Sequence, residues 1–238
     1  MTEAFKKRIE NKSQSNNSRL ILALDISNRK TSMEKAIRIL KDTSKHLSGV
    51  KIGYPSVLSF GLKIISESKE TSGLPIIADF KIADVPHINQ KIAQSAFDAG
   101  ADAVIAHAFL GGDSLQAVIE VAEEEGGGVI ALPNMSHPGS KAFIGPVSMK
   151  MAKMAVEVGS DGLIGPATRT EEITELRKLV GKKPLIFSPG VGAQGGKPGD
   201  AIRSGADFEI VGRSIYNSGE PRKAAEKMRK RINEGSRK

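Results

Sequence analysis

Eight short apolar runs recur along the chain, and each is followed by a segment with the periodicity of an amphipathic helix. The runs lie at residues 20–25, 49–53, 75–80, 102–107, 128–133, 161–165, 184–188 and 207–211. Intervening segments such as 33–40, 88–99 and 173–180 space apolar residues three or four positions apart, as one helix face requires. This alternation predicts an α/β protein with a single (β/α)8 TIM barrel.

The domain boundaries follow from the same pattern. Residues 1–18 are mostly polar, and the run 11–18 is too hydrophilic to join a core. We therefore expect residues 1–18 to be a polar N-terminal extension and residues 19–238 to form the catalytic barrel.

Composition narrows the classes of protein that the chain can belong to. It contains no cysteine, which excludes disulfides and thiolate metal sites. No apolar run approaches the roughly 18 residues of a membrane span, and no signal peptide is evident, so we expect a soluble, cytoplasmic protein without a membrane partner.

The net charge of +8 lies largely near the chain ends, and the absence of Trp leaves little for base stacking. We expect no nucleic-acid partner, whereas a small anionic substrate fits this charge.

The third apolar run carries charges that a buried strand rarely holds. Asp79 and Lys81 are two residues apart and project from one face of a strand, while Ala78 and Phe80 face the other side. Ions removed from water cost several kcal/mol each unless partners compensate them. A single Asp-x-Lys is more often a solvated ion pair at a strand end, so the other strand ends decide its meaning.

Active sites of (β/α)8 barrels lie at the carboxyl ends of the strands. In this chain those positions hold Asp25, Lys51, Asp79, Lys81, Asp84, His107, the loop 133–139, Pro166, the Gly-rich loop 189–196 and the segment 212–214. A Gly-rich loop after the seventh strand, with Gly212 and Arg213 after the eighth, predicts a phosphate site made of backbone N–H groups and a guanidinium. His107 stands alone, and such a histidine is more often a structural hydrogen-bonding group than an acid or base.

Several of these residues lie in motifs that occur together in one family. The motifs are LALD with Asp25, VKIG with Lys51, DFKIADVP with Asp79, Lys81 and Asp84, MSHPG with Ser136, SPGVGAQGG with Gln194, and VGRSIY with Arg213. Over residues 20–220 the chain resembles the orotidine 5'-monophosphate (OMP) decarboxylase family, in its short archaeal form. The resemblance implies a homodimeric barrel, without a cofactor, that converts OMP to UMP and CO2 in de novo pyrimidine synthesis.

The resemblance also implies roles for single residues. Lys81 is expected to protonate C6 of the pyrimidine, with Asp79 beside the substrate carboxylate. Asp84 is expected to reach the ribose in the neighbouring subunit, and Lys51 to belong to the catalytic charged array. The expected substrate-binding residues are Asp25 and Lys51 at the ribose, Ser136 at the pyrimidine, and Pro189, Gln194, Gly212 and Arg213 toward the phosphate.

One position departs from the family pattern. Ile88 stands where the family usually has a Thr that helps to hold the ribose across the dimer interface. Isoleucine has no hydroxyl to form that bond, although Asn89 beside it could compensate. Because of its position, we still expect Ile88 to be one of the substrate-binding residues.

Two other functions remain open. One is a magnesium-dependent 3-keto-gulonate 6-phosphate decarboxylase or hexulose-phosphate synthase, which uses the same barrel. Relatives of that kind are expected to carry an acidic residue where this chain has Lys51. No His cluster has metal-ligand spacing, so we expect no metal site. A non-catalytic nucleotide-binding module would be expected to have lost Asp79, Lys81 or Asp84, and all three are present.

Overall fold

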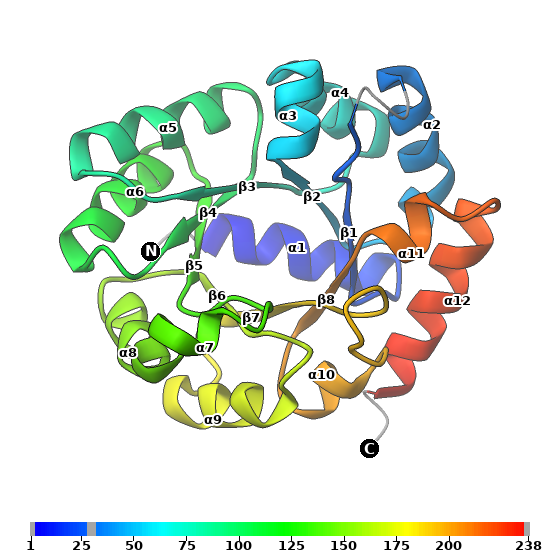
Figure 1. Ribbon diagram of the computed structural model, residues 1–238. Helices are drawn as coiled ribbons and strands as arrows, with labels where there is room; N and C mark the ends of the chain where they lie inside the picture. Colours follow the sequence, from blue (N-terminus) through cyan, green and yellow to red (C-terminus); the bar gives the residue numbers. More distant parts are fainter. Residues whose placement is uncertain (1–2, 28–31, 236–238) are drawn as a thin grey trace.

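Eight parallel strands close into a barrel in the order in which they occur along the chain (Figure 1). The computed structural model describes residues 3–27 and 32–235. The strands are Leu20–Ala23 (β1), Gly49–Gly53 (β2), Ile76–Ile82 (β3), Ala103–His107 (β4), Gly128–Leu132 (β5), Gly162–Ile164 (β6), Leu185–Pro189 (β7) and Phe208–Val211 (β8). Each overlaps one of the eight apolar runs, and β8 pairs with β1 to complete the ring. The predicted TIM barrel is confirmed.

Helices surround this ring and fill most of the strand connections (Figure 1). They are Glu3–Ser15 (α1), Met33–Thr43 (α2), Tyr54–Phe60 (α3), Lys63–Ser72 (α4), Pro86–Asp98 (α5), Gly112–Glu124 (α6), Ser140–Phe143 (α7), Ser148–Glu157 (α8), Thr170–Val180 (α9), Asp200–Arg203 (α10), Arg213–Tyr216 (α11) and Pro221–Glu234 (α12), with 3-10 turns at Ser44–His46 (η1) and Gly145–Val147 (η2). Among the described residues, no helix combines the length and apolar character needed to cross a membrane.

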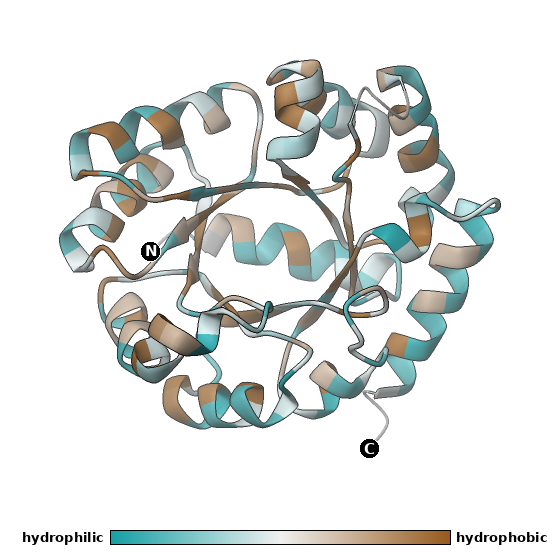
Figure 2. Cartoon of the chain, viewed as in Figure 1, coloured by the Kyte–Doolittle hydropathy of each residue, from teal (hydrophilic) through white to brown (hydrophobic). Residues whose placement is uncertain are grey.

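Alternate residues of the strands supply two separate hydrophobic cores. On β3, Ile77 packs inside the barrel, whereas Ala78 and Phe80 pack in the layer between the sheet and the helices. Figure 2 shows the same division, with apolar colour on the strands and polar colour over much of the outer helix surface. The period of two places Asp79 on the inner face, as the sequence predicts.

Three aspartates fix the amino ends of strands. Asp102, Asp161 and Asp207 each stand one residue before an even-numbered strand and accept a backbone N–H from the preceding strand, at 2.7–2.9 Å. Asp102 and Asp207 also form ion pairs with arginines. These carboxylates lie at the end of the barrel opposite the charged strand termini, so their function is structural.

The expected polar extension is instead largely a helix that covers the amino end of the barrel. Figure 1 shows α1 lying across the ring, and Phe5 and Ile9, one helical turn apart, are fully buried in the inner core. Phe5 stacks on Phe187 of β7 with ring centroids 6.4 Å apart. Gly128 makes room for it, because a Cβ at that position would lie 2.6 Å from the Phe5 ring.

Replacing Phe5 with Ala should lower the free energy of unfolding by about 3–5 kcal/mol, since it removes a large side chain from a closed core. Chemical denaturation followed by circular dichroism measures the change. Lys7→Ala, on the exposed side of the same helix, is the matched control and should change stability little. Equal midpoints for the two variants would contradict the structural role of α1.

Candidate active site

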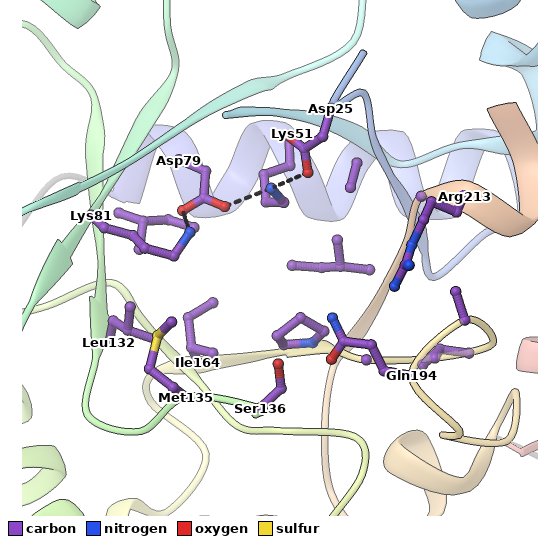
Figure 3. A pocket seen from close by; sticks show the side chains of 18 of the residues that line it. Asp25, Lys51, Asp79, Lys81, Leu132, Met135, Ser136, Ile164, Gln194 and Arg213 are labelled. Carbon is purple, nitrogen blue, oxygen red and sulfur yellow. Dashed lines mark hydrogen bonds and ion pairs between the residues drawn. The ribbon is translucent and has the colours of Figure 1, made fainter. Parts of the chain in front are cut away.

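A cavity of about 280 Å³ opens at the carboxyl ends of the strands (Figure 3). Nine of the predicted site residues line it: Asp25, Lys51, Asp79, Lys81, Ser136, Pro189, Gln194, Gly212 and Arg213. They come from strands and from the segments that follow strands far apart in the sequence, and barrel closure brings them together. Asp84 and Ile88 are not among the residues that line the cavity.

One wall of the cavity is a row of charges with alternating sign. Lys51 Nζ lies 3.2 Å from Asp25 Oδ2 and 2.5 Å from Asp79 Oδ2, and Lys81 Nζ lies 2.7 Å from Asp79 Oδ1. Lys51 and Asp79 are each 6% exposed, while Lys81 reaches toward solvent. Every carboxylate in the row therefore contacts an ammonium group, as burial of these ions requires.

The charge states of this row are set by competition between burial and attraction. Burial alone would lower the pKa of Lys51, but the adjacent Asp79 and Asp25 carboxylates outweigh it and raise that pKa. Burial would likewise raise the pKa of Asp79, yet Lys51 and Lys81 lower it overall. Both groups are consequently charged at neutral pH.

The backbone at Lys81 departs from a regular strand. Its φ is +46°, one of two positive values at non-glycine residues within the described ranges, and the β3–β4 register shifts between Ala78 and Ile82. A side chain in the left-handed region is uncommon, and such conformations concentrate at functional sites. Despite this irregularity, Lys81 lies beside Asp79 on the cavity side. The period-two pattern predicts the shared face but carries no signal for the register shift.

The residues predicted to serve a partner subunit lie outside this cavity. Asp84 is exposed, and Ile88 is half-buried at the start of α5. Asn89 is 2% exposed, and its side chain accepts the Asp84 N–H and donates to the Asp84 carbonyl and to Ser114. Its amide is engaged within its own chain and therefore does not replace the hydrogen bond that a hydroxyl at position 88 would form.

The predicted phosphate loop forms a compact turn after β7. Gly192 N–H donates to the Gly196 carbonyl and Gly196 N–H to the Gly190 carbonyl. Gly190 has a φ of +106°, and a Cβ there would lie 3.2 Å from Gln194 Oε1 and 3.8 Å from Ser136 Cβ. Ser136 and Gln194 therefore meet at this glycine, where a larger residue would separate them.

Arg213 begins α11 at the other side of the cavity from Lys81 (Figure 3). Across residues 3–27 and 32–235, no carboxylate forms an ion pair with it. Close to Arg213, the loops after β7 and β8 touch, since a Cβ on Gly192 would lie 2.5 Å from Ser214 Oγ. A guanidinium, the helix start and the Gly-rich loop can thus converge on one anion, whereas the carboxylates stand at a distance.

The floor of the cavity is apolar and the remaining wall carries an amide. The wall residues fall in the predicted loop 133–139, whereas no sequence pattern marks the floor. Buried residues of the inner core line the floor, namely Ile105, Leu132, Ile164 and Ile210, and Asn134 and Met135 precede Ser136. Aliphatic strand residues look alike whether they end in a core or in a cavity. Only the position of each residue along the axis of the closed barrel decides whether it lies in the core or lines the cavity.

His107 does not behave as the predicted structural hydrogen-bonding group. Its Nδ1 is buried without a hydrogen-bond partner, and its ring packs on Phe109 with centroids 4.8 Å apart. Burial, with a contribution from Lys81, lowers the pKa of His107 to about 4. The imidazole is therefore neutral at physiological pH.

The described part of the chain contains no group of three or more His, Asp or Glu side chains arranged to hold a metal ion. Asp25 and Asp79 are the two carboxylates on the cavity wall, and Lys51 Nζ lies between them. An ammonium occupies the position at which a divalent cation would bridge the pair.

Barrel closure, the charged row and the facing anion site together define a TIM-barrel enzyme for a phosphorylated substrate. Residues 18–228 match the model of the "Orotidine 5'-phosphate decarboxylase / HUMPS family". The chain belongs to this family.

Individual relatives agree. The orotidine 5'-phosphate decarboxylases of Methanosarcina barkeri and Thermococcus kodakarensis are 51% and 48% identical, over 88% and 90% of this chain and 92% and 97% of theirs. The crystal structure of the Methanocaldococcus jannaschii OMP decarboxylase complexed with the inhibitor BMP superimposes with a TM-score of 0.85, at 38% identity over 91% of this chain and 99% of that one. The crystal structure of the Pyrococcus horikoshii enzyme superimposes with a TM-score of 0.82, at 43% identity over 90% of this chain and 98% of that one.

Replacing Lys51 with Met should destabilise the protein by about 3–5 kcal/mol at pH 7, because it leaves the buried Asp79 with one ammonium partner fewer. Lowering the pH should reveal the cause. In the parent protein Asp79 has a lowered pKa, so its contribution is lost as pH falls. In the variant burial raises the pKa of Asp79, and stability should instead recover as the carboxyl takes up a proton.

Unfolding free energies from pH 7 down to about pH 2 test this sign, because the lowered pKa of Asp79 places the parent's loss at the acid end of that range. Lys63→Met removes a lysine from an exposed i,i+4 pair with Glu67 and is the control. It should cost no more than about 1 kcal/mol and should leave the pH profile unchanged. A parallel pH dependence for Lys51→Met and the parent would refute the proposed dependence of Asp79 on Lys51.

Proposed function

We propose that Lys81 is the proton donor in the decarboxylation of OMP and that the other cavity residues bind the substrate around it. The activity itself is that of an orotidine 5'-phosphate decarboxylase, a carboxy-lyase of UMP biosynthesis, the name carried by relatives of about 50% identity. The observation that supports the assignment of roles is the pairing of the Lys51–Asp79–Lys81 row with an anion site across the same cavity.

The reaction needs a cation where negative charge develops. When the bond between C6 and the carboxylate breaks, its electron pair stays on C6 in an orbital that cannot delocalise into the ring. A fixed ammonium lowers the energy of that carbanion and then transfers a proton to it. Lys81 is suited to both steps because its Nζ forms an ion pair with Asp79 Oδ1, 2.7 Å away, which holds the ammonium group in place.

The roles of the other cavity residues follow from the family resemblance, and their position on the lining of the same cavity supports them. Asp25 and Lys51 would bind the ribose hydroxyls, and Ser136 the pyrimidine. The 5'-phosphate would lie against Pro189, Gln194, Gly212 and Arg213. Binding energy from this remote end can support closure of loop 189–196 and orient the reacting carbon.

The rival magnesium-dependent decarboxylases and synthases are disfavoured by Lys51. Its Nζ contacts both wall carboxylates, so a divalent cation there would have to displace a buried ammonium group. A non-catalytic nucleotide-binding role is disfavoured by the row itself. Phosphate binding alone gives no reason to bury these charges on the cavity wall that faces the phosphate loop.

Replacing Lys81 with Ala should reduce OMP decarboxylation by about 10⁴-fold or more, because both the stabilising charge and the proton are lost. UMP binding should remain largely intact, since the phosphate and ribose contacts are unchanged. A spectrophotometric assay of OMP loss in the presence of EDTA measures the first, and calorimetry with UMP the second.

The parent protein should be equally active with and without EDTA. Unaltered turnover in Lys81→Ala would rule out the proposed proton donor. Loss of the parent activity in EDTA would instead favour the magnesium-dependent reaction.

Two copies of the chain are further proposed to form a dimer that shares its sites. A patch of exposed apolar side chains follows the adjacent strands β2, β3 and β4, and it comprises Tyr54, Leu58, Val85, Phe109 and Leu110. Leu58 is 82% exposed. Such a patch marks a contact surface, and Asp84, next to Val85, would be carried by it toward the ribose site of the second copy.

A mixture of Lys81→Ala and Asp84→Ala chains tests the shared site. Each variant alone should have low activity, but a mixed dimer would contain one complete site. Statistical reassociation after joint unfolding should then restore about a quarter of the parent activity.

Asp79→Asn mixed with Lys81→Ala is the control. Both changes fall within the wall that one chain supplies, so no mixed dimer contains a complete site. If Asp84→Ala gains no more activity on mixing than Asp79→Asn, Asp84 acts within its own chain or not at all.

A further inference from the structure

Two loops at the rim of the cavity are joined by three side chains to which the proposed reaction gives no role. Asn134 lies in the loop after β5, Arg169 in the loop after β6, and Glu172 in the first turn of α9. Asn134 Nδ2 donates to Glu172 Oε2 at 2.9 Å, and Arg169 Nε donates to Glu172 Oε1 at 2.5 Å. Glu172 therefore receives one hydrogen bond from each loop. We refer to these three residues as the interloop network.

The network ends on the backbone immediately before Ser136. Met135 N–H donates to Asn134 Oδ1 at 2.8 Å, and the Met135 carbonyl accepts from Arg169 Nη2 at 2.8 Å. Because Glu172 can only accept, it also fixes which end of the Asn134 amide points to Met135. Both polar groups of Met135 are thus held from the side chains of the network, and Ser136 follows directly, facing the cavity (Figure 3).

The network is sheltered enough to be well ordered. Asn134 is 4% exposed, and the side chains of Arg169 and Glu172 are 14% and 30% exposed. Each carboxylate oxygen has a different donor, which gives a more definite geometry than a surface ion pair. Arg169 and Glu172 also cancel in charge. Their influence on the reacting carbon therefore comes through position and not through a net electrostatic field.

We propose that Asn134, Arg169 and Glu172 are positioning residues that set how far the Ser136 hydroxyl reaches into the cavity. The inference rests on the proposed function, because contact of Ser136 with the pyrimidine is part of it. Ser136 stands on a loop and not on a strand, so its precision has to come from side chains that tie the loop to the barrel. The network supplies that tie from the neighbouring βα unit.

Glu172→Ala should lower kcat/KM for OMP by about 10- to 100-fold, the loss expected when a substrate-contacting group is displaced by about 1 Å. Glu172→Gln keeps an acceptor oxygen and should lose less. Glu175→Ala is the matched control, since it removes a glutamate exposed on the same helix and should leave kcat/KM unchanged.

A double-variant cycle with Ser136→Ala separates positioning from general weakening of the fold. If Glu172 acts through Ser136, adding Glu172→Ala to Ser136→Ala should cause little further loss in kcat/KM. Arg177→Met breaks an ion pair with Asp207 at the other end of α9, and any effect it has should instead multiply with that of Ser136→Ala. The cycle can be repeated with Glu172→Gln and Arg169→Lys should Glu172→Ala fold poorly.

Two results would overturn the inference, and they differ in what else they reject. In the first, Ser136→Ala lowers kcat/KM and this loss multiplies fully with that of Glu172→Ala. That result would reject the positioning role and leave the proposed function standing. An unchanged kcat/KM in Ser136→Ala would reject the proposed contact of Ser136 with the pyrimidine, and the inference with it.

Discussion

The site depends on two ion pairs that Lys51 forms, one with Asp25 and one with Asp79, inside the mouth of the barrel. Lys51 and Asp79 each stabilise the charge of the other, which matters because both are almost fully buried. The row continues to Lys81, the group with most access to a substrate. A buried charge is therefore compensated at each step, and the outermost ammonium is held in place before any substrate arrives.

This arrangement divides the site between strands and loops. The reacting end is built on β1, β2 and β3, whose positions the barrel fixes through parallel hydrogen bonding. The facing side is built on the loops after β5 and β7, which present Ser136 and Gln194. Strands give a geometry that changes little, whereas loops can adjust to a substrate. The chemistry is accordingly assigned to the rigid side and recognition of the substrate periphery to the adaptable one.

Much of this could be predicted from the sequence because it depends on local periodicity. The period of two placed Asp79 and Lys81 on one strand face, and the order of eight strands placed nine predicted residues on one rim. Phe5 and Ile9 were missed because two apolar residues in a polar helix barely change its average composition. The pairing of Asn134 with Glu172 joins residues 38 apart in the chain. Such a contact exists only after β5 and β6 pair, and no short-range pattern records it.

The placement of α1 bears on how the chain reaches its final structure. Among the described helices α1 comes earliest in the sequence, yet it docks on β5 and β7, including Phe187. Its two buried apolar side chains, Phe5 and Ile9, cannot be covered until β7, late in the sequence, is in place. Bringing such distant segments together costs chain entropy before any contact compensates it. Docking of α1 is thus coupled to completion of the ring. A half-built barrel would leave Phe5 and Ile9 exposed, and only the closed one covers them.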